Sequence, residues 1–476
     1  MIADLKPYPA MKDSGVPWLG KVPSIWSIAR NGRLFTQRNE TGFAHLPILE
    51  VSLKTGVRVR NLDGSGRKQM MFDRDKYKRA RKDDLAYNMM RMWQGAIGMA
   101  PTDGLVSPAY VVARPLRGGE PKFFLYLFRT DAYMGEVDKF SHGIVKDRNR
   151  LYWEGFKQMP SPVPPPDEQS AIVRFLDYAD RRIRRYILAK QKLIKLLEEQ
   201  KQAIIHRAVT RGVGPNVRLK ASGVEWLNDV PAHWDVVALR LRYSVQLGKM
   251  LDEKRITGEH SVPYLRNTDV QWDRINTDDL PVMDIRPEEY DRYTVREGDL
   301  LVCEGGEVGR AALWRGSLNP IGFQKALHRL RPLRPDRDNV RFLSFVLRDA
   351  AILGVFQADG SENTIAHLTA EKLRRRRIAF PPRDEQRSIV RHIEGAMTTV
   401  DHSVERVGRE IALLREYRTR LIADVVTGKL DVREAAASLP DESHEPDVLD
   451  DADALVGGDV EAGDAELNTA SEGVEE

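Results

Sequence analysis

Two long stretches of the chain carry apolar residues at alternating spacings of four and three. The first runs from Pro164 to Thr210, and after its three opening prolines it contains neither proline nor glycine. Its apolar seam consists of Ile172, Leu176, Ala179, Ile183, Tyr186, Leu193, Leu197 and Ile204. This spacing predicts a helix with one apolar stripe, about 60 Å long at 1.5 Å per residue. Such a helix needs a partner helix to cover its stripe.

The second stretch has the same pattern and supplies that partner. It opens with Pro-Pro-Arg-Asp-Glu-Gln at residues 381–386, where the first opens with Pro-Pro-Pro-Asp-Glu-Gln at 164–169. Its seam consists of Ile389, Ile393, Ala396, Val400, Val407, Leu414, Tyr417 and Leu421. Acidic residues at both openings suit helix N-termini, so the pattern predicts two long helices of one kind.

The helices belong to a larger tandem duplication. Glu168, Ile172 and Thr210 recur 217 residues later as Glu, Ile and Thr. Upstream of each helix, residues 12–26 return at 220–234, with Ser-Gly-Val-x-Trp-Leu in both copies. The second shift is 208 residues, so the segment between the repeats is nine residues longer in the second copy. An internal repeat of this kind determines the architecture.

The duplication predicts an α+β fold with two compact mixed blocks, separated by two long antiparallel coiled-coil helices in a pseudo-two-fold repeat. The first block is expected to contain strands at 48–53 and 110–113, a loop at 63–66 and a short helix at 123–129. The second is expected to contain strands near 262–266 and 295–302, a tight turn at 304–309 and a helix at 339–353. The expected segments are an N-terminal leading segment (1–26), the first block (27–163), the first long helix with a linker (164–219), the second block (220–380), the second long helix (381–432) and an acidic, disordered tail (433–476).

Charge is distributed unevenly along the chain. The net charge is +4, but residues 440–476 contain fourteen Asp or Glu and no Lys or Arg, so the first 439 residues carry +18. A body of this charge attracts polyanions, of which nucleic acid is the commonest in the cytosol. A single cysteine, Cys303, is consistent with a reducing compartment, and the N-terminus does not resemble a signal peptide. We therefore expect a cytoplasmic protein.

Motifs for catalysis and metal binding are largely missing from the sequence. The Gly-Lys pairs at 20, 248 and 428 lack the following Ser or Thr of a phosphate-binding loop, and the histidines lack metal-ligand spacing. Residues 107–110, Ser-Pro-Ala-Tyr, partly match a methyltransferase signature, but Ala109 stands where that signature has a second proline. The sequence therefore predicts no catalytic residue and no bound metal.

Basic and amide side chains are better candidates for function. The clusters at 181–185 and 374–377 could neutralise phosphates, although the first could equally be a solvated helix face. Arginine and lysine suit guanine edges, and asparagine and glutamine suit adenine edges. Within the blocks, the candidates of these types are Asn88, Arg91, Arg266, Asn267, Gln324 and Lys325. Each could instead be structural.

Together, these residues resemble the DNA-specificity subunit of type I restriction-modification systems. The resemblance rests on the Asp-Glu-Gln helix openings and on the Ser-Gly-Val-x-Trp-Leu repeats. It also rests on motifs within the blocks, at 104–110, 152–156, 298–306, 308–310 and 323–329. It covers about residues 10 to 430 and excludes the acidic tail.

The resemblance implies a subunit without catalytic activity that binds a bipartite DNA sequence, with one target-recognition domain for each half-site. The paired helices would set the distance between half-sites and would dock two methyltransferase (modification) subunits and restriction-translocase subunits. S-adenosylmethionine, ATP and Mg would be bound by those partners, and this chain would bind no cofactor directly. The expected DNA contacts are Asn88, Arg91, Ser107, Tyr110, Lys146, Arg148, Arg266, Asn267, Arg310, Gln324, Lys325 and Asn363. The expected docking residues are Ile172, Leu176, Ile183, Leu197, Ile389, Ile393, Leu414 and Leu421.

Two other functions stay open on sequence alone. A nuclease or methyltransferase acting by itself would need a complete catalytic motif, which the sequence lacks. A coiled-coil scaffold that binds DNA outside any restriction system would share the helices and the basic charge. A scaffold that binds no DNA would not need two dissimilar basic blocks, and its purified chain would fail to shift a DNA duplex at low salt.

The acidic tail should weaken DNA binding. Its fourteen carboxylates are tethered to the basic body, so they compete with DNA at high effective concentration. Deleting residues 440–476 should raise non-specific duplex affinity at about 50 mM salt, and the gain should shrink at about 200 mM, where screening weakens both interactions. Equal affinity of the full-length and shortened chains in titrations at both salt concentrations would mean that the tail does not contact the DNA-binding surface.

Overall fold

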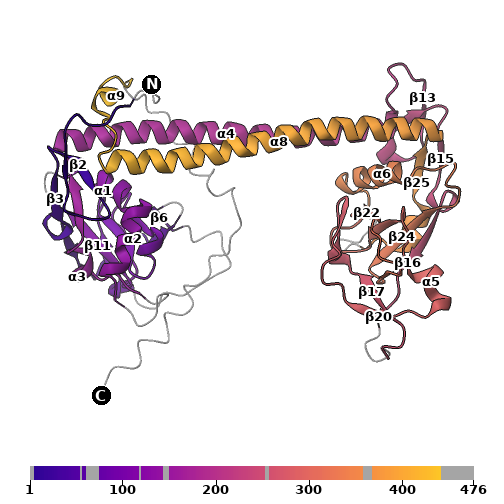
Figure 1. The fold of residues 1–476 in the computed structure, drawn as a ribbon, viewed down its shortest axis with the longest axis horizontal. Coiled ribbons are helices and arrows are strands. Elements are labelled where there is room, and N and C mark those ends of the chain that lie inside the picture. Colours follow the sequence, from indigo (N-terminus) through magenta and orange to yellow (C-terminus); the bar gives the residue numbers. More distant parts are fainter. Residues whose placement is uncertain are drawn as a thin grey trace. The chain divides into compact units, whose positions relative to one another are not determined.

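The computed structural model describes residues 5–53, 56–60, 74–116, 119–142, 149–251, 257–357 and 367–440. The chain forms two compact units. Unit 1 consists of Met1–Gln191 with Arg409–Glu476, and unit 2 consists of Lys192–Gly408. Helices α4 (Pro166–Arg211) and α8 (Arg383–Val426) are each divided between the two units. The predicted pair of long helices and the α+β class are confirmed (Figure 1).

Ion pairs between α4 and α8 show that the two helices run antiparallel. In unit 1, Asp180 pairs with Arg418 and Lys190 with Glu410. In unit 2, Lys201 Nζ lies 2.6 Å from Asp401 Oδ1. The partners on α8 therefore move toward its N-terminus as the contacts advance along α4, as the sequence predicted.

The seam between the helices is shifted by one residue from the predicted seam in the middle of α4. Tyr186 and Leu193 were predicted to lie in the seam, but 50% and 42% of their surfaces are exposed. The half-buried neighbours Ile187 and Ile194 take these positions instead. Tyr186 with Leu193 and Ile187 with Ile194 both continue the four-three series between Ile183 and Leu197, so spacing alone could not select the right pair. Tyr417 on α8 was predicted in the seam and is likewise exposed.

Unit 1 packs short strands and helices around an aromatic core. Its sheet of four antiparallel strands has the order β4-β11-β8-β9. The strands are β1 (Met11–Asp13), β2 (Lys21–Pro23), β3 (Ser27–Arg30), β4 (Phe35–Arg38), β5 (Leu49–Ser52), β6 (Gly56–Val59), β7 (Lys78–Ala80), β8 (Leu85–Asn88), β9 (Ile97–Met99), β10 (Gly104–Val106), β11 (Tyr110–Pro115) and β12 (Pro160–Val163). The helices besides the long pair are α1 (Pro121–Phe128), α2 (Asp131–Phe140), α3 (Trp153–Phe156) and α9 (Arg433–Ala437).

Unit 2 contains a sheet of four antiparallel strands with the order β16-β24-β21-β22. Its strands are β13 (Leu219–Ala221), β14 (Asp229–Pro231), β15 (Asp235–Ala238), β16 (Tyr243–Leu247), β17 (Ser261–Leu265), β18 (Val270–Gln271), β19 (Arg274–Ile275), β20 (Val282–Asp284), β21 (Leu300–Cys303), β22 (Ala311–Leu313), β23 (Gly322–Phe323), β24 (Leu327–Pro332) and β25 (Arg377–Phe380). Its other helices are α5 (Tyr290–Tyr293), α6 (Val340–Ile352) and α7 (Ala370–Arg375).

The two sheets are built in the same way although the blocks share little sequence. In each unit the first strand of the sheet is an edge strand, the next two form a hairpin, and the last pairs with both the edge strand and the hairpin. A helix follows the last strand in both units, α1 after β11 and α6 after β24. The leading hairpins β1-β2 and β13-β14 also correspond. The duplication therefore extends from the repeated motifs into the variable blocks.

The repeated Glu and Gln at each helix start join the helix to its block. In unit 1, Glu168 is buried and accepts hydrogen bonds from Trp26 Nε1 at 2.9 Å and from the Tyr8 hydroxyl at 2.5 Å. Burial and then the hydrogen bond to this carboxylate raise the pKa of Tyr8. Gln169 accepts from the main-chain N–H of Glu120, at the start of α1, and donates to the carbonyl of Pro164.

Unit 2 repeats these contacts. Trp234 Nε1 donates to Glu385 at 3.1 Å, and His233 Nε2 lies 2.7 Å from the same carboxylate. Gln386 accepts from the N–H of Asn339, before α6, and donates to the carbonyl of Pro381. The Asp-Glu-Gln motif therefore has one structural role in both copies.

The predicted local elements largely agree with the structure, apart from the start of the tail. The expected strands and helices correspond to β5, β11, β17, β21, α1 and α6, and residues 304–309 form turns. The expected loop at 63–66 lies outside the described residues. Residues 433–437, predicted to be disordered, form α9, because Val432 and Ala436 are buried in the core of unit 1. Within the described part, no helix combines the length and apolar character needed to cross a membrane.

Replacing Gly428 with alanine should destabilise unit 1. Gly428 follows α8 with φ +77°, and an added Cβ would lie 2.3 Å from Pro23 Cδ and 3.1 Å from the Trp26 ring. Left-handed backbone and overpacking each cost about 1–2 kcal/mol for a residue with a side chain. The midpoint of urea denaturation should therefore fall clearly.

Gly408 is the matched control, because it lies inside α8 with no atom within 4 Å of the position of an added Cβ. Gly408→Ala should leave stability unchanged or raise it by up to about 1 kcal/mol through helix propensity. Equal midpoints for Gly428→Ala and the wild type would contradict the close packing at Pro23.

Candidate nucleic-acid interface

One end of the sheet in unit 1 gathers the described candidate residues of the first block. Asn88 ends β8 and lies directly opposite Tyr110, which starts β11. Residues 89–96 join β8 to β9, and residues 107–109 precede β11. The side-chain oxygen of Asn88 accepts from the N–H of Met90 at 2.9 Å. The structure brings these candidates together at one end of the sheet, which we call its edge, although only Tyr110 was assigned to a strand from the sequence.

A half-buried lysine holds the turn at 107–110. Lys78 Nζ donates to the carbonyls of Pro108 at 2.9 Å and Tyr110 at 2.8 Å. Burial lowers the pKa of Lys78. Ser107 Oγ accepts a long 3.4 Å hydrogen bond from the N–H of Ala109. Lys78 thus fixes the main chain of the Ser-Pro-Ala-Tyr turn, while the side chain of Ser107 stays half-exposed.

The hairpin loop 89–96 presents polar and aromatic side chains to solvent. Arg91, Trp93 and Gln94 are exposed. Trp93 Nε1 donates to the carbonyl of Met90 at 3.0 Å, which fixes the indole at the loop. Arginine and an exposed aromatic ring suit contacts with bases or phosphates. Trp93 was missed in the sequence, where a lone tryptophan near a turn is indistinguishable from a core residue.

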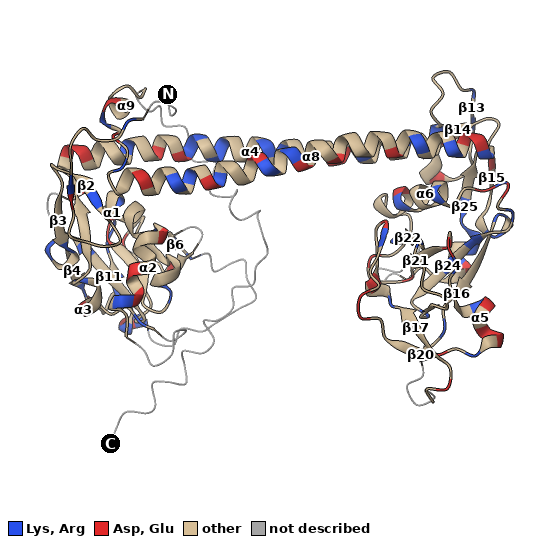
Figure 2. Ribbon diagram, viewed as in Figure 1, with Lys and Arg blue, Asp and Glu red and all other residues tan. Residues whose placement is uncertain are grey.

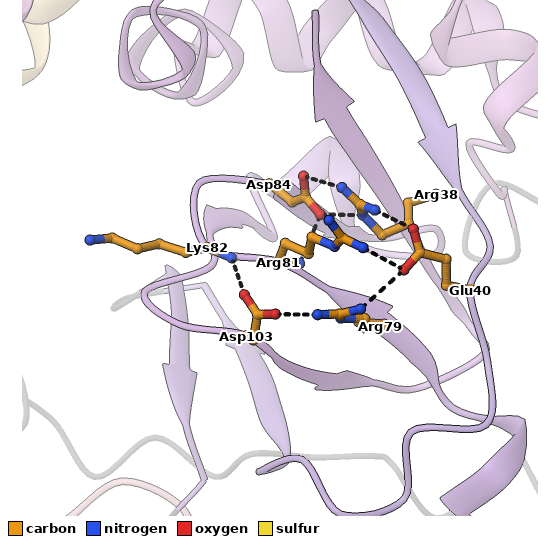
Figure 3. A network of polar contacts seen from close by, with 7 residues as sticks. All are labelled: Arg38, Glu40, Arg79, Arg81, Lys82, Asp84 and Asp103. Carbon is orange, nitrogen blue, oxygen red and sulfur yellow. Dashed lines mark hydrogen bonds and ion pairs between the residues drawn. The ribbon is translucent and has the colours of Figure 1, made fainter.

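Other basic residues of unit 1 belong to an ion-pair network (Figure 3). Arg38 is buried with Asp84, with 2.7 Å between Nε and Oδ2. Arg79 lies between Glu40 and Asp103, and the Arg79 guanidinium lowers the pKa of Asp103. The network joins residues at or near the ends of β4, β7, β8 and β10. Its arginines therefore have structural partners, and they carry no argument for DNA contact.

The corresponding end of unit 2 is more elaborate. Cys303 ends β21 opposite Leu327 at the start of β24, so the hairpin loop 304–310 corresponds to loop 89–96. The turn 324–326 corresponds to 107–109. Strands β17 and β23 run parallel beside it, which places residues 266–268 next to this turn. The N–H of Gln324 donates to the carbonyl of Leu265 at 3.1 Å. Gln324 and the exposed Lys325 thus lie at the end of this sheet that corresponds to the edge described in unit 1.

Three candidate side chains of unit 2 are engaged within the protein. Arg266 forms a two-pronged pair with Asp269, at 2.9 and 2.8 Å. Asn267 Nδ2 donates to the carbonyl of Gly305 at 3.0 Å, and Arg310 donates to the carbonyl of Asn267 at 3.0 Å. These bonds support the loops at the edge, and DNA contact by the three side chains stays a prediction.

The remaining predicted contacts are not placed at this edge by the structure. Lys146, Arg148 and Asn363 lie outside the described residues. The two arginine clusters are partly paired: Arg184 contacts Asp180, Arg375 contacts Glu371, and Arg374 donates to the carbonyl of Val245. Figure 2 shows basic and acidic residues interspersed along both long helices. Among the described residues, no cluster of His, Cys, Asp and Glu could hold a metal ion.

The predicted docking residues are mostly unavailable to a partner protein. Six are buried within the units: Ile172, Leu176, Ile183, Ile389, Ile393 and Leu421. The other two, Leu197 and Leu414, are half-buried in the seam. The blocks and the opposite helix cover most of the apolar stripe, so a partner would have to contact other residues of the helices, and docking at Leu197 and Leu414 stays a prediction.

A different set of apolar side chains on the helices is exposed. In unit 1 these are Tyr186, Leu413 and Tyr417, and in unit 2 they are Leu193 and Leu196. Four of them directly precede a half-buried apolar residue of the seam, and Tyr417 precedes Arg418, which pairs with Asp180 on the opposite helix. We call the three residues of unit 1 the apolar flank. The signal was present in the sequence as apolar residues next to the four-three series.

Comparisons with known proteins agree with this architecture. The chain is 22% identical over 320 residues to the type I restriction enzyme EcoKI specificity subunit of Escherichia coli K12, covering 65% of each chain. It is 26% identical over 138 residues to the EcoBI specificity subunit of Escherichia coli, covering 29% of this chain and 28% of that protein. The match therefore spans less than two thirds of either relative. No family model matches the chain.

Two solved structures have the same fold. The HsdS subunit of Thermoanaerobacter tengcongensis superposes with a TM-score of 0.53 at 17% identity, covering 87% of this chain and 98% of that one. A chain from a study of assembly and conformational transition of the type I R-M system superposes with a TM-score of 0.64 at 16% identity, covering 86% and 99%. The predicted fold class and the resemblance to specificity subunits are confirmed.

Proposed function

We propose that this chain, a relative of type I specificity subunits, is the non-catalytic DNA-recognition subunit of a type I restriction-modification complex. One observation carries the proposal: two blocks of dissimilar sequence share one sheet topology and present polar loops at the equivalent edge. A duplicated frame with different loops suits a protein that applies one binding mode to two different sequences. The +18 charge of residues 1–439 supports a polyanionic target.

Each unit would read one half-site of a bipartite target. In unit 1 the reading surface would be loop 89–96 with the turn at 107–110. In unit 2 it would be loop 304–310 with the turn at 324–326. Hairpin loops of this size can enter the major groove, where every base pair presents a distinct pattern of donors and acceptors. Because β8-β9 and β21-β22 are anchored in sheets, the loops would be presented at little entropic cost.

Partner subunits would bind along the helices through the apolar flank. Leu413 exposes 63% of its surface, and Tyr186 and Tyr417 are also exposed. The ion pairs Asp180–Arg418 and Lys190–Glu410 place these three residues on the same stretch of the helix pair, where they would form an exposed apolar surface. The occupants we propose are two modification subunits, with restriction-translocase subunits completing a cytoplasmic complex. S-adenosylmethionine, ATP and Mg would be bound by those partners.

Exchange of a single block should alter half of the recognised sequence. Replacing residues 27–163 with the corresponding block of a related subunit should change one half-site of the methylated sequence, because each sheet carries its own loops. Single-molecule sequencing of host DNA would show which bases are methylated. Changes in both half-sites would contradict independent reading by the two units, and unchanged methylation would contradict DNA reading by the first block.

A charge placed on the apolar flank should weaken assembly. Leu413→Asp should reduce the affinity for the modification subunit by about 10- to 100-fold, the usual effect of losing a central apolar contact. Leu318→Asp is the control, because Leu318 is an exposed leucine of unit 2 outside the helices. Both affinities can be measured by titration of the purified subunits. Equal binding by Leu413→Asp and the wild type would remove the apolar flank as the docking surface.

A further inference from the structure

The hairpin loop at 304–310 of unit 2 has a fixed shape. The main-chain N–H of Cys303 donates to the carbonyl of Arg310 at 2.8 Å, and the N–H of Arg310 donates to the carbonyl of Glu307 at 3.1 Å. Gly306 and Gly309 have φ values of +71° and +85°, and an added Cβ on Gly309 would lie 2.5 Å from the Phe356 ring. The glycines are therefore required by backbone conformation and close packing.

Neighbouring segments hold this loop on both sides. Asn267 Nδ2 donates to the carbonyl of Gly305, and the N–H of Leu368 donates to the carbonyl of Glu304 at 2.8 Å. Arg310 folds back, with 14% of its side chain exposed, and donates to the carbonyl of Asn267. The loop is thus bound to residues from two other parts of unit 2, and its own arginine is not directed toward solvent.

The charged side chain that the loop presents to solvent is Glu307. Its side chain is 54% exposed, whereas Val308 and Gly309 are buried and Glu304 is half-buried. Trp272 Nε1 donates to Glu307 Oε1 at 2.5 Å, and Arg310 Nη1 lies 3.5 Å from Oε2. The carboxylate is therefore held in one orientation while it remains accessible. Each oxygen keeps lone pairs that can accept further hydrogen bonds.

A fixed carboxylate at a DNA-reading edge has an unusual selectivity. It accepts a hydrogen bond from the amino group of cytosine, and by the same chemistry from that of adenine. The carboxylate is repelled by the acceptor atoms that guanine and thymine present in the major groove. It is also repelled by phosphates, so phosphate contacts add nothing to its binding energy. Its contribution to binding is therefore mainly rejection of wrong bases, which is how specificity is often achieved.

We propose that Glu307 is a specificity-determining residue of the second half-site, accepting a hydrogen bond from an exocyclic amino group in the major groove. Trp272, Asn267 and Arg310 position it. This inference rests on the proposed DNA-recognition function, and it identifies the class of base edge that the loop selects. The turn 324–326 is joined to this loop by a hydrogen bond from the N–H of Glu304 to the carbonyl of Ala326, and its exposed Lys325 would bind a phosphate or a guanine.

The isosteric variant Glu307→Gln separates reading from structure. Glutamine keeps an oxygen that can accept from Trp272 Nε1, so a purely structural Glu307 would tolerate the change. If Glu307 reads an amino group, the variant should lose about 10-fold or more discrimination at one base pair of the second half-site. The first half-site should be unaffected. Glu307→Ala should relax the same base pair.

The measurement is duplex binding by the complete complex with its modification subunits, over a panel substituted at each base pair of both half-sites. Asp336→Ala is the matched control, since Asp336 is an exposed carboxylate beyond the other end of β24. Melting temperatures of all variants would show that they fold. A wild-type complex without preference at any base pair would overturn the proposed function itself.

Two results would overturn the role of Glu307 while leaving the proposed function intact. One is identical base preference for the wild type, Glu307→Gln and Glu307→Ala. The other is loss of binding to every duplex by folded variants, which would make Glu307 necessary for affinity and not for the choice of base. Relaxation confined to a single base pair of the second half-site supports the proposal.

Discussion

The structure depends on a hydrogen-bonded carboxylate at the start of each long helix, buried in unit 1 and half-buried in unit 2. Glu168 in unit 1 and Glu385 in unit 2 accept hydrogen bonds from the tryptophan of the leading segment. The glutamine that follows each of them accepts a hydrogen bond from the main chain directly before α1 or α6. A buried carboxylate is costly unless its oxygens are satisfied. Correct docking of the leading segment, the block and the helix satisfies Glu168, so this one group makes the assembly of three segments interdependent.

This arrangement explains how the blocks can differ while their frames stay alike. The hydrogen bonds of the Glu and Gln that open each long helix go to three places. They go to side chains of the leading segment, to a main-chain carbonyl just before the long helix, and to the main chain just before α1 or α6. None of these contacts involves the hairpin loops at the far edge of the sheet. The loops can therefore change in length and composition without altering the helix junction. Loop 89–96 with its tryptophan and loop 304–310 with its glycines are two such solutions on one topology.

The sequence predicted the frame well and the reading edge only partly. Repeats and four-three spacing identified both helices, because these features are local and periodic. The exact seam could not be assigned, since Tyr186 and Ile187 both fit the spacing and burial by α8 decides between them. The common sheet topology was not predictable, because its strands are short and pair across long gaps in sequence. Several candidates chosen by residue type lie at the corresponding ends of the two sheets, but type alone could not show that Arg266 and Asn267 bond inward.

Unit 1 is composed of segments from distant parts of the chain, and this has a consequence for synthesis on the ribosome. Its core brings Tyr8 and Trp26 together with Leu421, Val425 and Val432. At about 5–20 residues per second, the second group emerges roughly 10 to 50 s after the first part of the unit is complete. Unit 2, which is continuous in sequence, can close during that interval. The nascent first unit therefore waits with an uncovered apolar surface, and the unit made second is the first to reach its final form.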